Sequence, residues 1–365
     1  MKTTKKPGKK RFLRFFSYIL LLALIVLTYT ILLSDLDKNA LLHALDGAHV
    51  GVLGIGLLCV LGYVFFEGCA IRTLCASLGV KFGYFAAFRY ACVELFFSAA
   101  TPSSTGGQPL MIYYMCREGA PVTVAGTAVL INTIAYALTT FLFGLFAVLL
   151  EADEVFAMRP AFVVAVILGC TVCLVLIAGC LMCLFWSSLV RKVAIGVVRF
   201  LTFIRLVRRR EKCIAWIEEH LVEFRAGADH VRRHPLVFLR ALAENCGQRI
   251  CYLVVSYCVY RSFGLSGISV IPIMLLQMIM TIPAYSVPLP GGVGITELMF
   301  LELYDFIYLS EERCTAAMML TRGLNHYLCV LLCGVVVIAT HIYSEKKAAL
   351  AAATAPCDAE TSLEG

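Results

Sequence analysis

Charged residues are scarce in this chain, and their scarcity sets the first limit on its structure. Asp, Glu, Lys and Arg make up only 15% of the 365 residues, against about 25% in a typical soluble domain. Hydrophobic residues make up 61%, and the mean hydropathy is +0.87. This composition excludes an ordinary soluble domain and indicates an all-α polytopic membrane protein.

Paired metal-ligand motifs are also lacking, although the chain has 17 cysteines. Most of them stand singly in apolar runs, and the closely spaced pair in CTVC at 170–173 lies inside an apolar stretch. A zinc site would need a CxxC pair together with a second CxxC or a pair of histidines, and a disulfide framework would not place its cysteines singly in apolar runs. We interpret the cysteines as reduced helix-packing residues, and we expect no metal and no other cofactor.

The N-terminal segment MKTTKKPGKKRFLR is strongly basic and precedes the apolar run FFSYILLLALIVLTYTILL. This run has full spanning length, about 20 residues, and no A-x-A cleavage site follows it. We therefore predict a basic cytoplasmic N-terminus at 1–13 and an uncleaved first span in a bacterial cytoplasmic membrane.

Five further apolar runs are long enough to span the bilayer, which gives about six spanning helices. They are 49–67, 122–150, 160–186, 236–263 and 314–343. Basic residues at 187–235 and in SEKK after the last run predict the cytoplasmic side, whereas the acidic linkers around 34–47 and 151–158 predict the outside. Both termini would then be cytoplasmic.

Two other apolar stretches, 84–116 and 269–309, are interrupted by residues that break helices. The breakers are Pro102, Gly106 and Gly107 in the first stretch, and Pro288, Pro290, Gly291 and Gly292 in the second. The orientation derived from charge requires each stretch to begin and end on the same side of the membrane. We therefore predict two re-entrant helical hairpins that enter from opposite faces, as an inverted repeat within a transmembrane domain at 14–344.

Each Gly–Gly pair precedes a helix, which we expect to begin near Gln108 in one hairpin and near Ile295 in the other. A helix N-terminus carries unpaired N–H groups and partial positive charge, so it binds anions such as phosphate. Two opposed N-termini would bind the phosphate of a lipid near the middle of the bilayer. The alternative is that the glycines only permit tightly packed turns.

Polar side chains inside the predicted spans are candidate site residues, because they are costly in lipid. We predict that the substrate is contacted by the breaker residues above together with Arg249, Arg322 and Asn325, and Arg322 is our first candidate for the lipid phosphate.

Acidic residues and one histidine are candidates for a coupled proton or for ion pairs: Glu94, Glu244, Glu297 and His326. Glu94 and Glu297 fit the role of helix caps equally well. Glu244 is predicted to pair with Arg249, and Arg240 is expected to extend towards the cytoplasmic surface.

The segment 187–235 interleaves basic and apolar residues, as in VRKVAIGVVRFLTFIRLVRRR. This pattern is typical of an amphipathic helix on the anionic inner leaflet, and it fits ordinary positive-inside decoration as well. Because the basic residues adjoin the membrane, we expect no nucleic-acid partner. The alanine-rich tail at 345–365 is predicted to be disordered.

The segment VPLPGGVGITELMF, which contains P-x-PGG-x-G-x-x-E, resembles a signature of the membrane domain of lysylphosphatidylglycerol synthases. TPSSTGGQPLMIYYMCREG resembles an earlier element of that family, and LTRGLNHYLCVLLCG resembles its last-span arginine motif. The resemblance runs from about residue 14 to 344. Family members often carry an acidic residue where this chain has Gln108, so a role for a carboxylate at that position does not transfer.

The resemblance implies a lipid flippase, which moves an anionic or aminoacylated phospholipid such as lysylphosphatidylglycerol between leaflets. It also implies a link to resistance against cationic antimicrobial peptides. Two alternatives remain: phosphatidylglycerol lysyltransferase activity, which in full-length members belongs to a soluble domain that we do not find in this sequence, and a non-transporting scaffold for a separate lipid-modifying enzyme.

Overall fold

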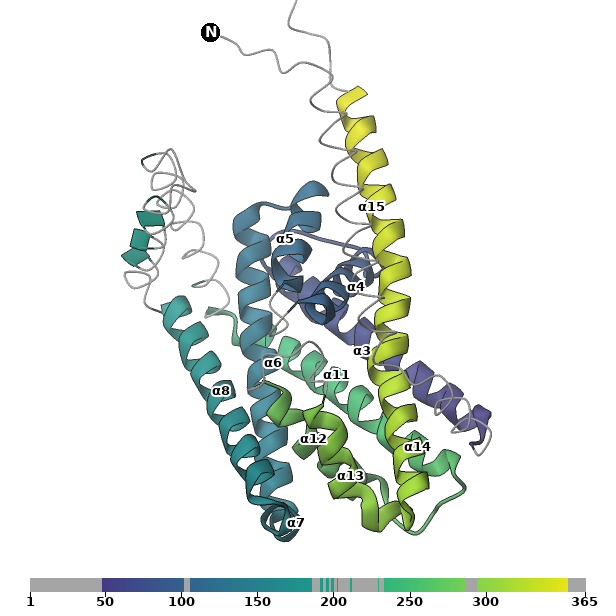
Figure 1. Ribbon diagram of the computed structural model, residues 1–365. Helices are drawn as coiled ribbons and strands as arrows, with labels where there is room; N and C mark the ends of the chain where they lie inside the picture. The colour runs from purple at the N-terminus through teal and green to yellow at the C-terminus, as the bar shows by residue number, and fades with distance from the viewer. Residues whose placement is uncertain are drawn as a thin grey trace, which may run out of the picture.

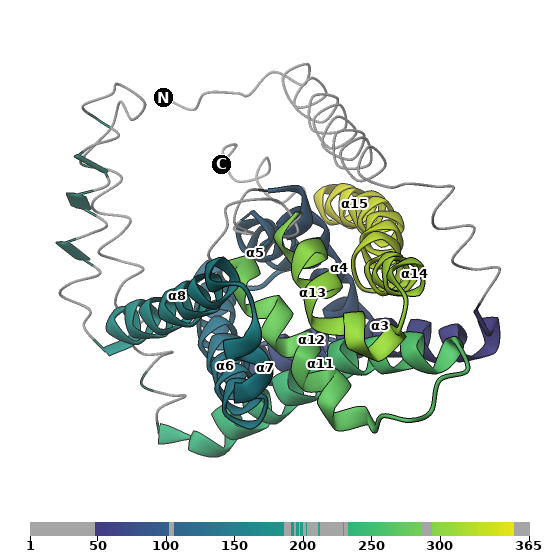
Figure 2. The same ribbon diagram turned by 60° about the horizontal axis from the view of Figure 1, so that its bottom comes forward.

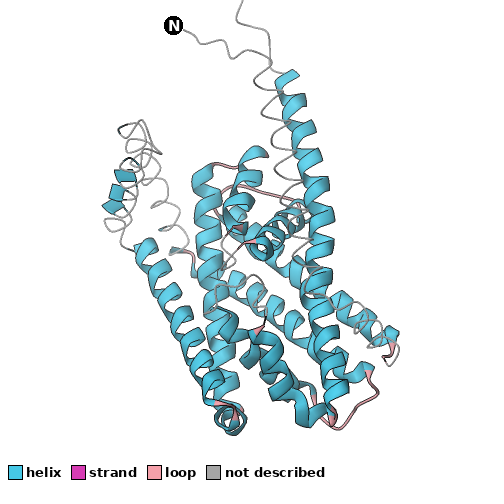
Figure 3. Cartoon of the chain, in the orientation of Figure 1, coloured by secondary structure: helices cyan, strands magenta, loops and turns pink. Residues whose placement is uncertain are grey.

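The computed structural model describes residues 48–101, 106–185, 233–285 and 294–353, with scattered positions between 191 and 229. Within these residues the chain is helical and has no strand (Figure 3). Four helices are long and apolar enough to cross a membrane: Val50–Ser77, Val122–Leu150, Pro160–Gly179 and Glu311–Ser344. The predicted first span and most of the amphipathic segment 187–235 lie outside the described residues.

The helices follow one another in two similar runs. The first run comprises α3 (Val50–Ser77), α4 (Tyr84–Ala100), α5 (Gly107–Arg117) and α6 (Val122–Leu150), followed by α7 (Ala152–Ala157) and α8 (Pro160–Phe185). The second run comprises α11 (Pro235–Ser262), α12 (Val270–Thr281) with the 3-10 turn η2 (Ile282–Tyr285), α13 (Ile295–Tyr308), α14 (Glu311–Arg322), the π-helical η4 (Gly323–Leu328) and α15 (Cys329–Ala353). Each run thus contains a helix of 28 residues, two short helices and a long helix.

Two boundaries predicted from the sequence are wrong. The span expected to end at 67 continues to Ser77, because Glu67 is hydrogen-bonded inside the bundle and does not mark a membrane surface. The tail expected to be disordered from 345 begins as helix, since α15 extends to Ala353. Its alanines have high intrinsic helix propensity, which favours this extension.

Helices α3 and α11 pack closely against each other as an antiparallel pair that crosses the bundle obliquely (Figure 1). The backbone N–H of His49, before α3, donates to the carbonyl of Ser262 at the end of α11, at 2.8 Å. Glycines allow the two helices to approach: a Cβ on Gly62 would lie 3.0 Å from the Cys251 sulfur. Seen from below, α8 lies against α6 on one side of the bundle, and α14 and α15 lie on the other (Figure 2).

The first pair of short helices begins and ends at the same end of the bundle. Arg89 near the start of α4 forms a bidentate ion pair with Glu118 just after α5, with both N–O distances at 3.0 Å. A cavity of about 420 Å³ is lined by residues of the α3–α4 loop, by Glu118 and Gly119, and by Tyr343 of α15. Both loops therefore adjoin the C-terminal part of α15.

The second pair lies towards the opposite end, and it also begins and ends together (Figure 1). The hydroxyl of Tyr260, at the end of α11, accepts from the N–H of Ile268 before α12, at 3.0 Å. The ring of Tyr260 lies 6.2 Å from that of Tyr308, the last residue of α13. The loops on either side of this helix pair therefore meet at one place.

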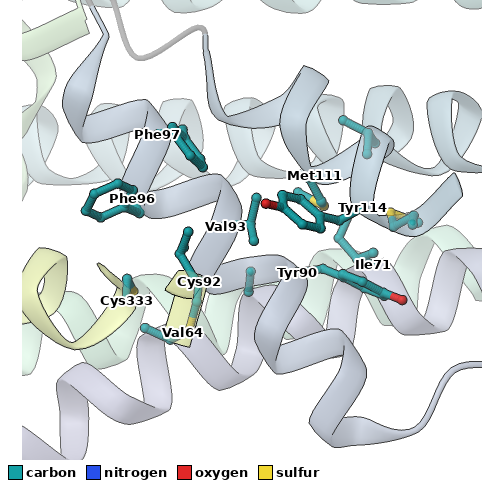
Figure 4. Packing of buried hydrophobic residues seen from close by; sticks show 14 of the residues in the cluster. Val64, Ile71, Tyr90, Cys92, Val93, Phe96, Phe97, Met111, Tyr114 and Cys333 are labelled. Carbon is teal, nitrogen blue, oxygen red and sulfur yellow. The ribbon is translucent and has the colours of Figure 1, made fainter. Parts of the chain in front are cut away.

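Each pair contributes to its own apolar core. The first core gathers α3, α4, α5 and α15 around residues such as Phe96, Met111 and Cys333 (Figure 4). The second gathers α11 to α14 and includes Phe300 and Tyr304, whose rings stack at 4.2 Å. The polar residues described below lie on the helices that join the two cores.

Helix α8 supplies a matched test of this packing. A Cβ on Gly169 would lie 2.4 Å from the carbonyl oxygen of Ile282, whereas a Cβ on Gly179 meets nothing within 4 Å. We expect Gly169→Ala to destabilise the protein by about 1–3 kcal/mol through overpacking. Gly179→Ala should be neutral, or stabilising by up to about 1 kcal/mol, because alanine favours helix. Thermal unfolding in detergent measures both variants, and equal midpoints would contradict the α8–η2 contact.

Candidate functional site

A polar cluster is buried where α3, α6 and α11 meet. The Asn132 amide donates to a carboxylate oxygen of Glu67 at 2.8 Å, and the Asn245 amide donates to the Asn132 side-chain oxygen at 3.0 Å. Gln248 hydrogen-bonds the same Glu67 carboxylate. All four side chains belong to residues that are at most 5% exposed. The bundle thus holds a carboxylate within a network of amides, far from the helix ends.

Arg249 brings the opposite charge into this cluster. The residue is 2% exposed; its guanidinium donates to the Thr140 hydroxyl and lies 4.7 Å from the centre of the Tyr136 ring. Its charge also acts on Glu67 across the α3–α11 contact. Buried opposite charges are tolerated when they offset each other and are hydrogen-bonded. Arg249 and Glu67 therefore form the charged centre of the cluster.

Glu94 connects the first short-helix pair to this centre. Its carboxylate accepts from the Ser98 hydroxyl at 2.9 Å and interacts electrostatically with Glu67. Tyr63 of α3 packs against Tyr252 of α11, with the two ring centres 5.8 Å apart. Four helices, α3, α4, α6 and α11, therefore contribute to one polar region.

The first Gly–Gly turn is closely packed against α4. The N–H of Gly106 donates to the Thr101 hydroxyl at 2.9 Å, and a Cβ on Gly107 would lie 2.0 Å from the carbonyl oxygen of Glu94. Gly107 is therefore required for the close approach of two backbones. Pro102 lies outside the described residues.

The second turn is followed by a charged contact. Glu297, in the first turn of α13, accepts from the N–H of Gly294 at 2.6 Å and forms an ion pair with Arg322 at 2.8 Å. Arg322 also donates to the hydroxyl of Thr296. Glu297 thus caps α13 and pairs with an arginine at once. Pro288, Pro290, Gly291 and Gly292 lie outside the described residues.

The last two predicted site residues lie in the helical segment that follows Arg322. Asn325 and His326 belong to η4, and the Asn325 amide donates to the backbone carbonyl of Tyr252 in α11 at 3.3 Å. The π-helical segment directly follows Arg322, and such segments often occur at functional sites. The ring of His326 lies 5.5 Å from that of Tyr327.

The predicted pairing of Glu244 with Arg249 is wrong. Glu244 pairs with Arg240 at 3.3 Å and accepts from the Thr73 hydroxyl at 2.8 Å. Residues four apart on a helix lie on one face, which favours Arg240, whereas Arg249 is five residues away and faces α6. Arg240 is largely exposed, with 63% of its side chain accessible, whereas only 14% of the Glu244 side chain is accessible.

Sequence reasoning missed Glu67, the acidic residue of the cluster. The predicted span 49–67 ends at this residue, although the apolar run FFEGCAI continues on both sides of it. That continuity was the available signal. The Arg89–Glu118 ion pair was also missed, although the predicted hairpin at 84–116 brings the start of α4 and the end of α5 to the same side, because a charge near a helix end also fits a solvated surface residue.

A comparison with protein families agrees with this architecture. The model of the family described as "Lysylphosphatidylglycerol synthase TM region" matches residues 15–333, which include the first helix run, the second run up to the start of α15, and the polar cluster. A search of curated proteins found no match. The match confirms the family predicted from the PGG segment: the chain belongs to the lysylphosphatidylglycerol synthase transmembrane region family.

Proposed function

We propose that this protein is a lipid flippase of a bacterial cytoplasmic membrane, which moves an anionic or aminoacylated phospholipid between leaflets. The observation that carries this proposal is the buried cluster of Glu67, its amide partners and Arg249. A polar headgroup needs such partners to pass through a bilayer, because a bare hydrocarbon path would leave it without hydrogen bonds.

The arrangement of the short helices supports a transport path. Each pair begins and ends at one end of the bundle, which is the geometry of a re-entrant hairpin, and the two pairs lie towards opposite ends. Non-helical backbone between such helices is tolerated where it is buried in protein or lines a wet cavity. Opposed hairpins that flank a polar cluster are therefore the expected setting for alternating access.

Matching contacts support an inverted repeat. In the first run the Gln108 amide donates to Thr133, 25 residues later, at 2.9 Å, and in the second run Arg322 donates to Thr296, 26 residues earlier. Each contact ties the first turn of the second short helix to the long helix that follows. The loops after these short helices also correspond, because Gly119 and Leu309 both have positive φ.

Arginines are the best candidates for the phosphate of the lipid. Arg249 lies in the cluster and Arg322 beside the second hairpin, and a guanidinium binds phosphate by bidentate hydrogen bonds. Gly107 packs against backbone, so the first glycine turn positions α5 and leaves phosphate binding to these side chains. A phosphate that replaces Glu297 at Arg322 would release the contact between α13 and α14.

One observation favours a second candidate function. The description of the matching family names a synthase. Phosphatidylglycerol lysyltransferase activity is therefore the alternative, and a scaffold for a separate enzyme is the second alternative. New lysyl-lipid in extracts of cells that express this chain would favour the enzyme. Transport would account for resistance to cationic peptides by changing the charge of the outer leaflet.

The test is a leaflet-sidedness assay in proteoliposomes with labelled phospholipids. We expect Arg322→Ala to slow translocation by about tenfold or more, because a hydrogen bond to a charged group contributes about 1.5–3 kcal/mol. Arg313→Ala is the control, since Arg313 is exposed on the same helix. Arg322→Lys keeps the charge and should retain part of the rate. A folded Arg322→Ala protein that works at the wild-type rate would contradict the proposal.

A further inference from the structure

The cavity formed by the α3–α4 loop, the α5–α6 loop and α15 shares no residue with the polar cluster. Its volume is about 420 Å³, within the range of about 300–1,000 Å³ that is usual for small-molecule sites. Lys81, Arg89 and Glu118 are the charged residues that line it. Two positive charges and one negative charge leave the lining with a net charge of +1, which favours an anion.

Arg89 is the buried cation of this cavity. Only 6% of its side chain is accessible, and its ion pair with Glu118 uses one N–H of each terminal nitrogen. A guanidinium has five N–H groups, so three of them have no acceptor among the described residues. The centre of the Tyr343 ring, which also lines the cavity, lies 4.5 Å from the guanidinium. Because a buried donor without an acceptor is costly, this wall of the cavity requires an oxygen-bearing ligand.

Further donors line the same cavity. Helix α4 begins after Gly83, which has no capping side chain, and its first turn has no acidic residue. The first N–H groups of a helix have no acceptor within it and carry partial positive charge. Gly83, Phe85 and Ala86 line the cavity, so these N–H groups adjoin it. Lys81 is exposed in the loop before α4 and has no ion-pair partner among the described residues. Guanidinium, ammonium and backbone donors therefore converge on one space.

Exposed aromatic rings place this cavity at the level of lipid headgroups. Phe85 is 76% exposed, Tyr84 51% and Tyr343 50%. The guanidinium of Arg72 lies 4.0 Å from the centre of the Tyr84 ring. Aromatic and basic side chains together mark the membrane–water interface, and basic pockets between membrane helices bind lipid headgroups. These neighbours favour an anion that is carried by a lipid.

We propose that this cavity binds the headgroup phosphate of an anionic phospholipid, with Lys81, Arg89 and the N-terminus of α4 as its ligands. The bound lipid joins the start of α4, the loop after α5 and the C-terminal part of α15. This site goes beyond the proposed flippase function, because a lipid held here stabilises the fold whether or not it is transported. Inorganic phosphate offers the same oxygen atoms without acyl chains, and the first test separates the two sources.

The first test measures thermal unfolding of the full chain in a neutral detergent with added phosphatidylglycerol, phosphatidylcholine or inorganic phosphate. We expect phosphatidylglycerol to raise the wild-type midpoint as its concentration increases, because a ligand that binds the folded state stabilises it. Lys81→Gln should require about fivefold more phosphatidylglycerol for the same rise, as expected for one basic residue near a membrane surface. Arg313→Gln is the control, since Arg313 is exposed on α14 and should respond as wild type does.

Two results of this test would overturn the proposal. Equal responses of the wild type and Lys81→Gln to phosphatidylglycerol would mean that the lipid binds elsewhere. An equal rise with inorganic phosphate alone would mean that the cavity is a site for a free anion.

The second test locates the lipid directly. Phosphatidylglycerol with a photoreactive group on its headgroup is cross-linked to the protein, and peptide mass spectrometry identifies the adducts. We expect adducts within 80–89, at 118–119 and beside Tyr343. Lys81→Glu changes the net charge of the lining from +1 to −1 and should reduce these adducts by about tenfold or more.

The distribution of adducts also separates this site from the flippase function. Adducts confined to α6 and α11 would overturn the proposal and leave the flippase function standing. If adducts form in the cavity but no lipid moves in the leaflet assay, the lipid site stands and the flippase function falls.

Discussion

Replacing Gly107 with alanine should cost the protein about 3 kcal/mol or more and abolish lipid movement. The added Cβ would lie 2.0 Å from the carbonyl oxygen of Glu94 and 2.3 Å from the Ser98 hydroxyl. Neither atom can move away by itself. The carbonyl oxygen belongs to the backbone of α4, and the Ser98 hydroxyl is hydrogen-bonded to the Glu94 carboxylate. The first short-helix pair would have to separate, and overpacking of this degree is at the upper end of measured costs.

Gly126→Ala is the matched control for this prediction. Gly126 lies in α6, and a Cβ there meets nothing within 4 Å. We expect this change to be neutral or to stabilise by up to about 1 kcal/mol, because alanine is the better helix former. Thermal unfolding and the leaflet assay measure both variants. Similar unfolding midpoints for Gly107→Ala and Gly126→Ala would show that α4 and α5 do not pack as described.

Arg249→Met should be nearly as damaging, for an electrostatic reason. Removing the guanidinium leaves Glu67 as an uncompensated charge in the bundle, and breaking a buried pair in this way typically costs about 3–5 kcal/mol. The double variant Glu67→Gln, Arg249→Met removes both charges and should recover most of the stability. Unfolding midpoints for the single and double variants complete a double-mutant cycle.

The same cycle separates stability from transport. We expect the double variant to fold but to translocate phospholipid at least tenfold more slowly than wild type, because its cluster no longer offers a cation to the headgroup phosphate. Arg159→Met is the surface control, since 80% of the Arg159 side chain is accessible in its pair with Glu302 and exposed ion pairs contribute little. A double variant that transports normally would remove Arg249 from the path.

The presence of the long helices could be predicted well from the sequence, because a long apolar run in a membrane has few conformations open to it besides a helix. The structure places α6 at 122–150 and α11 at 235–262, within one residue of the predicted runs. The breaks in the chain were equally visible, since proline and glycine interrupt helices by their own backbone chemistry. The π-helical segment after Arg322 could not be predicted, because its residues do not differ in type from those of an ordinary helix.

The contacts of the site were less accessible to sequence reasoning. Periodicity places Arg249 and Gln248 on α11, yet it does not say that their partner is Glu67 on α3. The Thr73–Glu244 contact joins the same two helices across 171 residues of the chain. The role of Gly107 was open for the same reason. A glycine before a helix fits both an anion site and a close backbone approach, and only the position of α4 distinguishes the two.

The most direct test of the whole account is the sidedness of four loops. Short epitopes inserted after Gly79, Gly119, Gly264 and Leu309 would be probed in vesicles of both orientations; the three glycines leave open space around their backbone, and Leu309 is 81% exposed. The account predicts that tags at Gly79 and Gly119 are accessible from one side, and tags at Gly264 and Leu309 from the other. Tags at Gly79 and Gly119 on different sides would mean that α4 and α5 cross the membrane, which would contradict the opposed hairpins and the path between them.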